Sequence, residues 1–225
     1  DYGPFGFIDD YDPGFICNHS DYNGRYAFNQ QPYIGLWNLS CLAQALLPLA
    51  EKDALKAALD RYTPVCEGRY LELMRAKLGL AEERDDDGGL IQDLLALMAQ
   101  QRADYTVFFR SLNEFRSAPG ESNDRLRDFF LERPAFDAWA GRYAGRLRAE
   151  GSVDAARAER MNRVNPKYVL RNYLAQQAIE QAQQKNYGEI DRLLSLLQDP
   201  FSERPDMESY AAPPPNWGKH LAVSC

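Results

Sequence analysis

Hydrophobic residues recur at helical spacing through most of this chain, from Pro32 to about residue 200. They follow one another every three or four positions, as on one face of an α-helix, and short polar or Gly/Pro-containing linkers separate the stretches. The pattern predicts a mainly α-helical protein. The expected helices cover residues 32–47, 52–62, 64–78, 90–101, 105–115, 124–131, 134–150, 166–179 and 187–197, with a polar helix or an ordered loop at 151–160.

In the helix expected from Pro32, apolar residues should form one face, and Asn165-Pro166 should start a later helix with proline at its first position. The apolar face of the first of these helices consists of Leu36, Leu39, Ala43, Leu46 and Leu47, and Trp37 and Leu42 widen it.

Both ends of the chain lack this periodicity. Residues 1–32 are rich in Gly, Asp, Asn, Pro and aromatic side chains, and Asn23-Gly24 between short aromatic segments predicts at most a small hairpin. After Asp199-Pro200 the sequence becomes Pro-rich and is expected to be extended. We therefore expect a loop-rich segment at 1–32, a helical region at 33–200 and an extended tail at 201–225.

The amino-acid composition argues against some classes of function. With 26 basic and 33 acidic residues the formal net charge is −7, which argues against nucleic acid or an anionic membrane as the main partner. No apolar run approaches the roughly 20 residues of a membrane-spanning helix. The chain starts without Met, directly on a turn-rich segment at Asp1, and we expect it to be a piece of a longer protein.

Structural metal sites are not expected. The four cysteines match no zinc-ligand spacing, and the run Asp85-Asp86-Asp87 lacks the spaced ligands of a calcium loop. Cys41 and Cys66 fall within or beside expected helices and are predicted to be buried apolar thiols.

Asp1-Tyr2-Gly3 is the first feature that points to chemistry. In protein kinases an Asp-aromatic-Gly triplet holds Mg²⁺ against the nucleotide phosphates and is followed by an activation segment and a block of helices. The triplet alone is weak, but the same order of elements occurs in this chain.

Longer stretches carry a resemblance that covers the chain from the first residue to the last. This sequence closely resembles the selenoprotein O family. The matching stretches are Asp1-Tyr2-Gly3-Pro4-Phe5-Gly6-Phe7-Ile8-Asp9, Tyr11-Asp12-Pro13-Gly14-Phe15-Ile16-Cys17-Asn18-His19-Ser20-Asp21, Asn29-Gln30-Gln31-Pro32, Gly35-Leu36-Trp37-Asn38-Leu39, Asn165-Pro166-Lys167-Tyr168-Val169-Leu170-Arg171-Asn172 and Trp217-Gly218-Lys219-His220-Leu221.

The resemblance implies the helical C-lobe of a protein-kinase-like fold, preceded by an activation segment. It implies an enzyme that uses ATP with Mg²⁺ or Mn²⁺ to transfer AMP to Ser, Thr or Tyr hydroxyls of proteins. Asp1 falls on the family's metal-binding aspartate and would contact ATP through the metal. The other catalytic parts would lie in a missing N-terminal part of the same protein, so this chain alone is expected to be inactive. Bacterial members are cytoplasmic and eukaryotic members mitochondrial.

Several other side chains allow two interpretations of their role. Asp9, Asp12 and Asp21 could bind a metal or simply solvate a turn, and we favour the solvated turn. His19 could be a general base, but in a tight loop hydrogen bonding to the backbone is favoured. For Arg171-Asn172, contact with the active-site loop and a capping or salt-bridge role are equally expected.

The resemblance also bears on Cys17 and Cys225, because some family members carry selenocysteine near the C-terminus, which suggests a redox role. A Cys17–Cys225 disulfide would tie the tail to the activation segment and contribute roughly 5 kcal/mol in the chain-entropy model. The alternative is two free thiols.

A second class of function stays open, namely a non-catalytic helical module that docks partner proteins and uses its Pro-rich tail for recognition. A conventional kinase is a weaker third possibility. The matching stretches favour the adenylyltransferase.

Overall fold

The computed structural model describes residues 6–17, 20–219 and 221, and within these ranges the chain is mainly helical, as predicted. No β-strand forms there, and the β-contact present is an isolated bridge between Asp10 and Asp104. No helix of the described ranges is long and apolar enough to cross a bilayer. The α-helices are α1 (Gln31–Ala45), α2 (Lys52–Asp60), α3 (Tyr62–Lys77), α4 (Asp87–Gln101), α5 (Tyr105–Ser111), α6 (Asp124–Arg127), α7 (Arg133–Ala149), α8 (Asp154–Asn162), α9 (Asn172–Gln183) and α10 (Gly188–Gln198), and the 3₁₀ turns are η1 (Phe28–Gln30), η2 (Leu112–Glu114) and η3 (Pro205–Tyr210).

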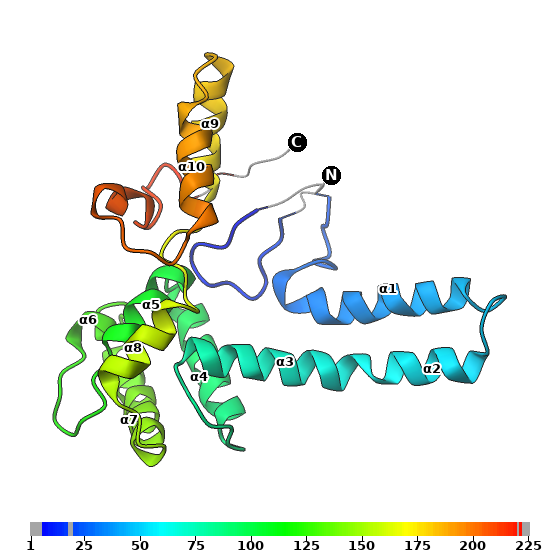
Figure 1. Ribbon diagram of the computed structural model, residues 1–225, viewed down its shortest axis with the longest axis horizontal. Coiled ribbons are helices and arrows are strands. Elements are labelled where there is room, and N and C mark those ends of the chain that lie inside the picture. Colours follow the sequence, from blue (N-terminus) through cyan, green and yellow to red (C-terminus); the bar gives the residue numbers. More distant parts are fainter. Residues whose placement is uncertain (1–5, 18–19, 220, 222–225) are drawn as a thin grey trace.

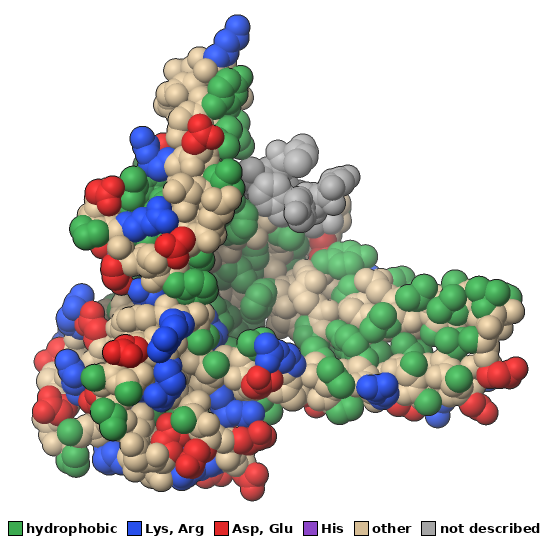
Figure 2. Space-filling model, viewed as in Figure 1, with side chains coloured by type: hydrophobic (Ala, Val, Ile, Leu, Met, Phe, Trp, Pro, Cys, Tyr) green, Lys and Arg blue, Asp and Glu red, His purple; other side chains and the backbone are tan. Residues whose placement is uncertain are grey.

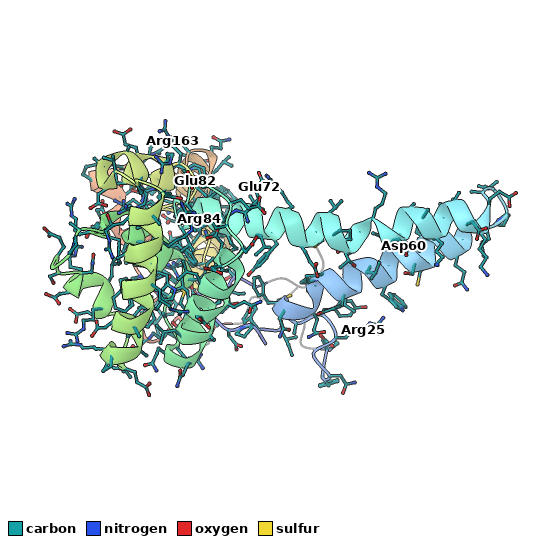
Figure 3. The ribbon with its side chains drawn as sticks, turned by 90° about the horizontal axis from the view of Figure 1, so that it is seen from below. Arg25, Asp60, Glu72, Glu82, Arg84 and Arg163 are labelled. Atoms are coloured by element: carbon teal, nitrogen blue, oxygen red, sulfur yellow. The ribbon has the colours of Figure 1, made fainter. Side chains whose placement is uncertain are left out.

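Three groups of helices are visible in Figure 1. Helices α4 to α8 form a compact body, α9 and α10 form a hairpin above it, and α1 runs beside α2 and α3 as an arm that projects from the body. Figure 3 shows the same arm from below, with Glu72 close to the body and Asp60 farther out. The loop of residues 6–30 lies where arm, body and hairpin meet.

The body has an aromatic core. Phe130 stacks on Phe136 with ring centroids 5.0 Å apart, and Trp139 stacks on Tyr143 at 4.9 Å. The polar atom of the buried indole is satisfied, because Trp139 Nε1 donates to the Leu90 carbonyl at 3.0 Å. These rings join α7 to α4 and to the segment that follows α6.

Helix α3 ends at Lys77, and the chain turns at Gly79 toward α4. Gly79 has φ +69°, in the left-handed region that glycine adopts without strain. A Cβ atom there would lie 2.6 Å from Arg157 Cγ and 2.8 Å from Met161 Cγ. Glycine is therefore required both by the backbone and by the close approach of α8.

The α9–α10 hairpin has its own small core, in which Tyr173, Leu174, Ala178 and Leu193 are buried. The preceding segment corrects a prediction, since Pro166 does not start a helix. Instead the amides of the next two residues, 167 and 168, both donate to the Pro200 carbonyl, at 2.8 and 3.1 Å. Pairing with the end of α10 holds these residues out of helical geometry, so α9 begins only at Asn172.

The tail is less extended than predicted. Residues 205–210 form η3, and the Tyr168 hydroxyl donates to the Arg204 carbonyl at 3.1 Å. Trp217 packs edge-on against Tyr173, with ring centroids 6.0 Å apart. Side-chain contacts with Tyr168, before α9, and with Tyr173, in α9, thus fold the described part of the tail back onto the protein.

The Asn23-Gly24 turn is present without strands. Gly24 has φ +67°, and the chain doubles back so that the Phe28 amide donates to the Phe15 carbonyl and the Asn29 amide to the Pro13 carbonyl, both at 2.9 Å. The predicted loop with at most a small hairpin is therefore a loop closed by a few backbone hydrogen bonds.

The apolar face of the first helix is left largely uncovered. No residue of α1 or α2 is buried, and α3 buries only Met74. The apolar spacing thus predicted the helix correctly, but within the described residues nothing covers the apolar side chains of α1 enough to bury them.

Candidate functional site at the loop anchor

The loop that follows the Asp1-Tyr2-Gly3 triplet is fixed to the body by backbone pairing. The Tyr11 amide donates to the Ala103 carbonyl at 2.8 Å, and the Tyr105 amide donates to the Asp9 carbonyl at 2.9 Å. These two bonds form the isolated bridge between Asp10 and Asp104. The pairing places residues 9–11 against the start of α5.

Arg171 connects this pairing to α9. Its guanidinium is only 1% exposed and donates to Asp104 Oδ2 at 2.9 Å, to Asp104 Oδ1 at 3.2 Å and to Asp9 Oδ1. Asp104 also caps α5, because its Oδ1 accepts the Val107 amide at 2.9 Å. One buried cation thus holds two carboxylates that come from different parts of the chain.

The charge balance of this cluster affects Asp9. Burial raises the pKa of the Asp9 carboxyl, while the hydrogen bond and positive charge of Arg171 act to lower it. Arg171 Nε is buried and has no hydrogen-bond partner among the described residues. Because the carboxylates of Asp9 and Asp104 share a single guanidinium, their ion pairs require the side chain of Arg171.

Asn172 holds the loop two residues further upstream. Its Oδ1 accepts the Phe7 amide at 3.1 Å, and its Nδ2 donates to the Phe7 carbonyl at 3.4 Å. The side-chain amide thereby pairs with the backbone of Phe7 as a neighbouring strand would. We call Phe7, Asp9, Asp104, Arg171 and Asn172 the loop anchor.

A small cavity of about 220 Å³ adjoins the loop anchor. Its walls come from the loop, from α9 and from the tail, which contributes Lys219. Asp10 faces it and pairs with exposed Arg102, Nε to Oδ2 at 3.4 Å. A cavity below the roughly 300 Å³ typical of small-molecule pockets is too small to hold a nucleotide on its own.

Of the predicted site residues, several fall on turns. Asp12 Oδ1 accepts the Gly14 amide at 2.8 Å, and Asp21 accepts the amides of Arg25 and Tyr26 at 2.8 and 2.7 Å. Both thus lie in turns, as favoured, and their carboxylates also cap the turn amides. Asp9 is instead an ion-pair partner.

In the acidic run at the start of α4, Asp87 has a structural role. It is 1% exposed, and Arg146 Nε donates to its Oδ1 at 2.7 Å. In the described ranges of the chain, no three His, Cys, Asp or Glu side chains lie close enough together to hold a metal ion. The described residues therefore do not make up a metal centre by themselves.

Asp1, His19 and Cys225 lie outside the described residues, so their predicted roles are not tested by the structure. Cys17 is half-buried in the loop. The prediction of buried thiols is wrong for Cys41, which is exposed on α1, and for Cys66, which is half-buried. The cause is the uncovered arm to which both belong.

Comparison with known proteins decides the family. The family model described as "Protein adenylyltransferase SelO" matches residues 1–198. This chain belongs to the SelO family. The resemblance seen in the sequence is therefore confirmed.

Individual SelO-family relatives match over the whole chain. A protein of Myxococcus xanthus named "Protein nucleotidyltransferase YdiU" is 60% identical over 225 residues, and proteins of the same name from Thioalkalivibrio sulfidiphilus and Pseudomonas paraeruginosa are 55% and 52% identical. All of this chain is covered in each case, against 46% of the relative. The chain thus spans about half the length of the curated relatives it matches.

Part of the loop anchor was predictable from the sequence. Arg171-Asn172 stood out as a stretch shared with the SelO family, and the structure shows both a salt bridge and a contact with the loop. Asp104 was missed. The signal available for it was only that of an acidic residue just before a helix, which predicts a cap and says nothing about a distant arginine.

Proposed function

We propose that this chain is the C-terminal part of a protein adenylyltransferase that transfers AMP from ATP to Ser, Thr or Tyr hydroxyls of proteins. In this reaction the hydroxyl oxygen forms a bond to the α-phosphorus, the bond from that phosphorus to the bridging oxygen of the β-phosphate breaks, and pyrophosphate leaves. The hydroxyl proton must pass to a base, which we place in the part of the protein that this chain does not span.

The family match is the observation that carries this proposal. A family model described as an adenylyltransferase covers residues 1–198, and relatives named nucleotidyltransferases match the chain from end to end. The loop anchor supports it, because it fixes the backbone at Phe7, six residues after Asp1. A metal-binding loop needs such support to keep its ligand in place.

Asp1 is the proposed metal ligand and would contact ATP through Mg²⁺ or Mn²⁺, whose charge would offset that of the phosphates. One carboxylate does not suffice to fix such an ion, so further ligands and the cations that hold the phosphates are needed. We therefore expect this chain alone to be inactive and to require the rest of the protein as its partner. Titration of this chain with Mg-ATP should show no micromolar binding.

The decisive experiment uses the full-length parent with ATP labelled on either the α- or the γ-phosphate. Protein-bound α-label without γ-label, lost in Asp1→Ala, would support both AMP transfer and the role of Asp1. Transfer of the γ-label would make the protein a kinase. No label at all would favour the alternative, a helical interaction module, which the named relatives do not favour now.

The organisation predicted from sequence is part of the proposal. Residues 1–32 would be the metal-binding loop and activation segment, 33–200 the helical C-lobe, and 201–225 the tail. Neither nucleic acid nor a membrane is proposed as a partner. We propose a cytoplasmic location if the protein is bacterial and a mitochondrial one if it is eukaryotic, in line with the members it resembles.

A disulfide between Cys17 and Cys225 is a proposal about regulation. Cys17 lies in the anchored loop, close to Gly6, so a bond there would tie the tail to the segment that follows Asp1. Peptide mapping of oxidised protein should find the two cysteines joined. Alkylation of both in that sample would contradict the disulfide.

A further inference from the structure

Helix α1 has the composition of a buried helix and lies on the surface. Its fifteen residues include no Asp, Glu, Lys or Arg, and apolar side chains occur all around it. A helix of this kind is normally enclosed by other elements. Yet none of its residues is buried, and Trp37 and Leu42 are 51% and 54% exposed.

The uncovered apolar residues gather in this region. More than half of the exposed large hydrophobic side chains among the described residues belong to residues 16–73. Figure 2 shows apolar side chains over the α1 side of the arm, while charged side chains gather at its tip and lower edge. We call this apolar region the arm surface, and its exposed members include Tyr33, Trp37, Leu39, Leu42 and Leu47.

A surface of this kind needs an occupant, because monomeric proteins rarely expose large contiguous apolar patches. We infer that the arm surface docks onto the part of the full-length protein that this chain does not span. The inference rests on the proposed function in one respect, that the chain is part of a longer nucleotidyltransferase. Relatives are about twice as long as this chain, so an occupant of sufficient size is available in the same polypeptide.

Docking on the arm surface bears on the loop of residues 6–30, because α1 and this loop are connected by direct contacts. Gln31, at the start of α1, donates from Nε2 to the Tyr26 carbonyl at 2.6 Å, and the Arg25 guanidinium lies 4.4 Å from the Trp37 ring. The loop of residues 6–30 is therefore attached to α1 at one end and to the loop anchor at the other. A domain seated on the arm surface lies beside the loop that would carry the metal ligand.

Because α1 carries no charged residue, it restricts the chemistry of the occupant. The face of the occupant that contacts α1 must be apolar, since no ionic group on α1 could pair with a charge brought against it. The charged residues of the arm belong to α2 and α3, including the exposed pair Arg69–Glu72. The occupant should cover α1 and leave that charged edge in water.

Native Cys41 reports on this docking. Cys41 is exposed on α1, so a maleimide should label it rapidly in this chain. In the full-length parent we expect at least tenfold slower labelling of Cys41, read by peptide mapping. Cysteine introduced as Leu131→Cys, at a position 92% exposed on the body, should react equally in both proteins. Equal labelling of Cys41 in the two proteins would overturn the inference.

A charge on the arm surface gives a second test. In the full-length parent, Leu42→Glu should raise Cys41 labelling toward the rate seen in this chain, whereas Leu131→Glu should not. Leu42→Glu should leave the helicity of this chain unchanged, since Leu42 is exposed here.

These experiments distinguish a failure of the docking inference from a failure of the proposed AMP transfer. If this chain alone forms a dimer by light scattering with Cys41 already protected, a second copy is the occupant and the inference fails. Protection of Cys41 in a full-length parent that transfers no AMP would keep the inference and reject the proposed activity.

Discussion

Arg171 holds Asp104 through two hydrogen bonds, Nη1 to Oδ2 at 2.9 Å and Nη2 to Oδ1 at 3.2 Å, in a site where both side chains are buried. The same guanidinium reaches Asp9. The beginning of the described chain, the start of α5 and the start of α9 therefore meet at one cation. Losing it would leave two carboxylates without their common partner.

We expect Arg171→Met to reduce the free energy of unfolding by about 3–5 kcal/mol, because it leaves buried carboxylates unpaired. Arg171→Lys should lose less, since it keeps the charge but not the two-pronged geometry. Urea denaturation measures both. The control is Arg133→Met, which breaks an exposed pair with Asp128 and should cost less than about 1 kcal/mol. Equal losses for Arg171→Met and Arg133→Met would contradict the structural role of the anchor.

Asn172→Ala should loosen the loop without unfolding the body. The Phe7 amide loses its side-chain acceptor, and a hydrogen bond worth about 1 kcal/mol corresponds to several-fold to tenfold faster amide exchange. Hydrogen exchange measured by NMR at Phe7 and in the core of α7 would show this. Asn186→Ala, at the exposed end of the α9–α10 hairpin, is the matched control and should leave Phe7 unchanged.

Lys77 gives a pH dependence of known sign. Burial lowers the pKa of its ammonium to about 8, although the rings of Tyr105 and Phe109 lie 5.1 and 4.6 Å away and favour the charged form. The unfolded chain keeps this proton up to about pH 10.4, so it binds more protons than the folded chain above pH 8. Lys77 should therefore contribute stability that rises between pH 8 and about 10.4.

Comparison with Lys77→Met isolates this effect. Relative to the variant, the unchanged chain should gain roughly 1–2 kcal/mol of unfolding free energy between pH 8 and 10. Guanidinium denaturation at several pH values measures the difference. The exposed Lys56→Met change is the control, and its pH profile should follow that of the unchanged chain. A parallel profile for Lys77→Met would refute the prediction.

Substituting two glycines that both have positive φ distinguishes the cost of backbone strain from the cost of steric crowding. Gly79→Ala adds a Cβ atom 2.6 Å from Arg157 Cγ, whereas Gly120→Ala, at φ +83°, meets nothing within 4 Å. Gly120→Ala should cost about 1–2 kcal/mol from the left-handed conformation alone. Gly79→Ala should cost clearly more, because α8 must also shift. Equal melting temperatures for the two variants would show that α8 yields freely.

The helices were predictable because each is encoded by local spacing. Pro166 shows the limit of local signals. Proline at a first helical position is a valid rule, but here the following two amides pair with Pro200, more than thirty residues away. The Arg171–Asp104 contact joins residues 67 apart, and no periodicity carries such information. What sequence did supply was the resemblance, which singled out Arg171 and Asn172 without saying what they contact.

Burial was the least predictable property. The apolar spacing of α1 correctly indicated a helix, but the described chain leaves its apolar side chains uncovered. Cys41 was predicted to be buried for the same reason. A sequence reports what the intact protein requires of a residue, and this chain is about half the length of its relatives.

The loop anchor also sets an order of events during synthesis. Phe7 and Asn172 are 165 residues apart, and Asp9 and Arg171 are 162 apart. At roughly 5–20 residues per second, a ribosome needs about 8–30 s between making the loop and making the residues that hold it. Throughout that interval the segment after Asp1 lacks its contacts with Arg171 and Asn172, so the candidate metal site can be completed only after most of the chain has been translated.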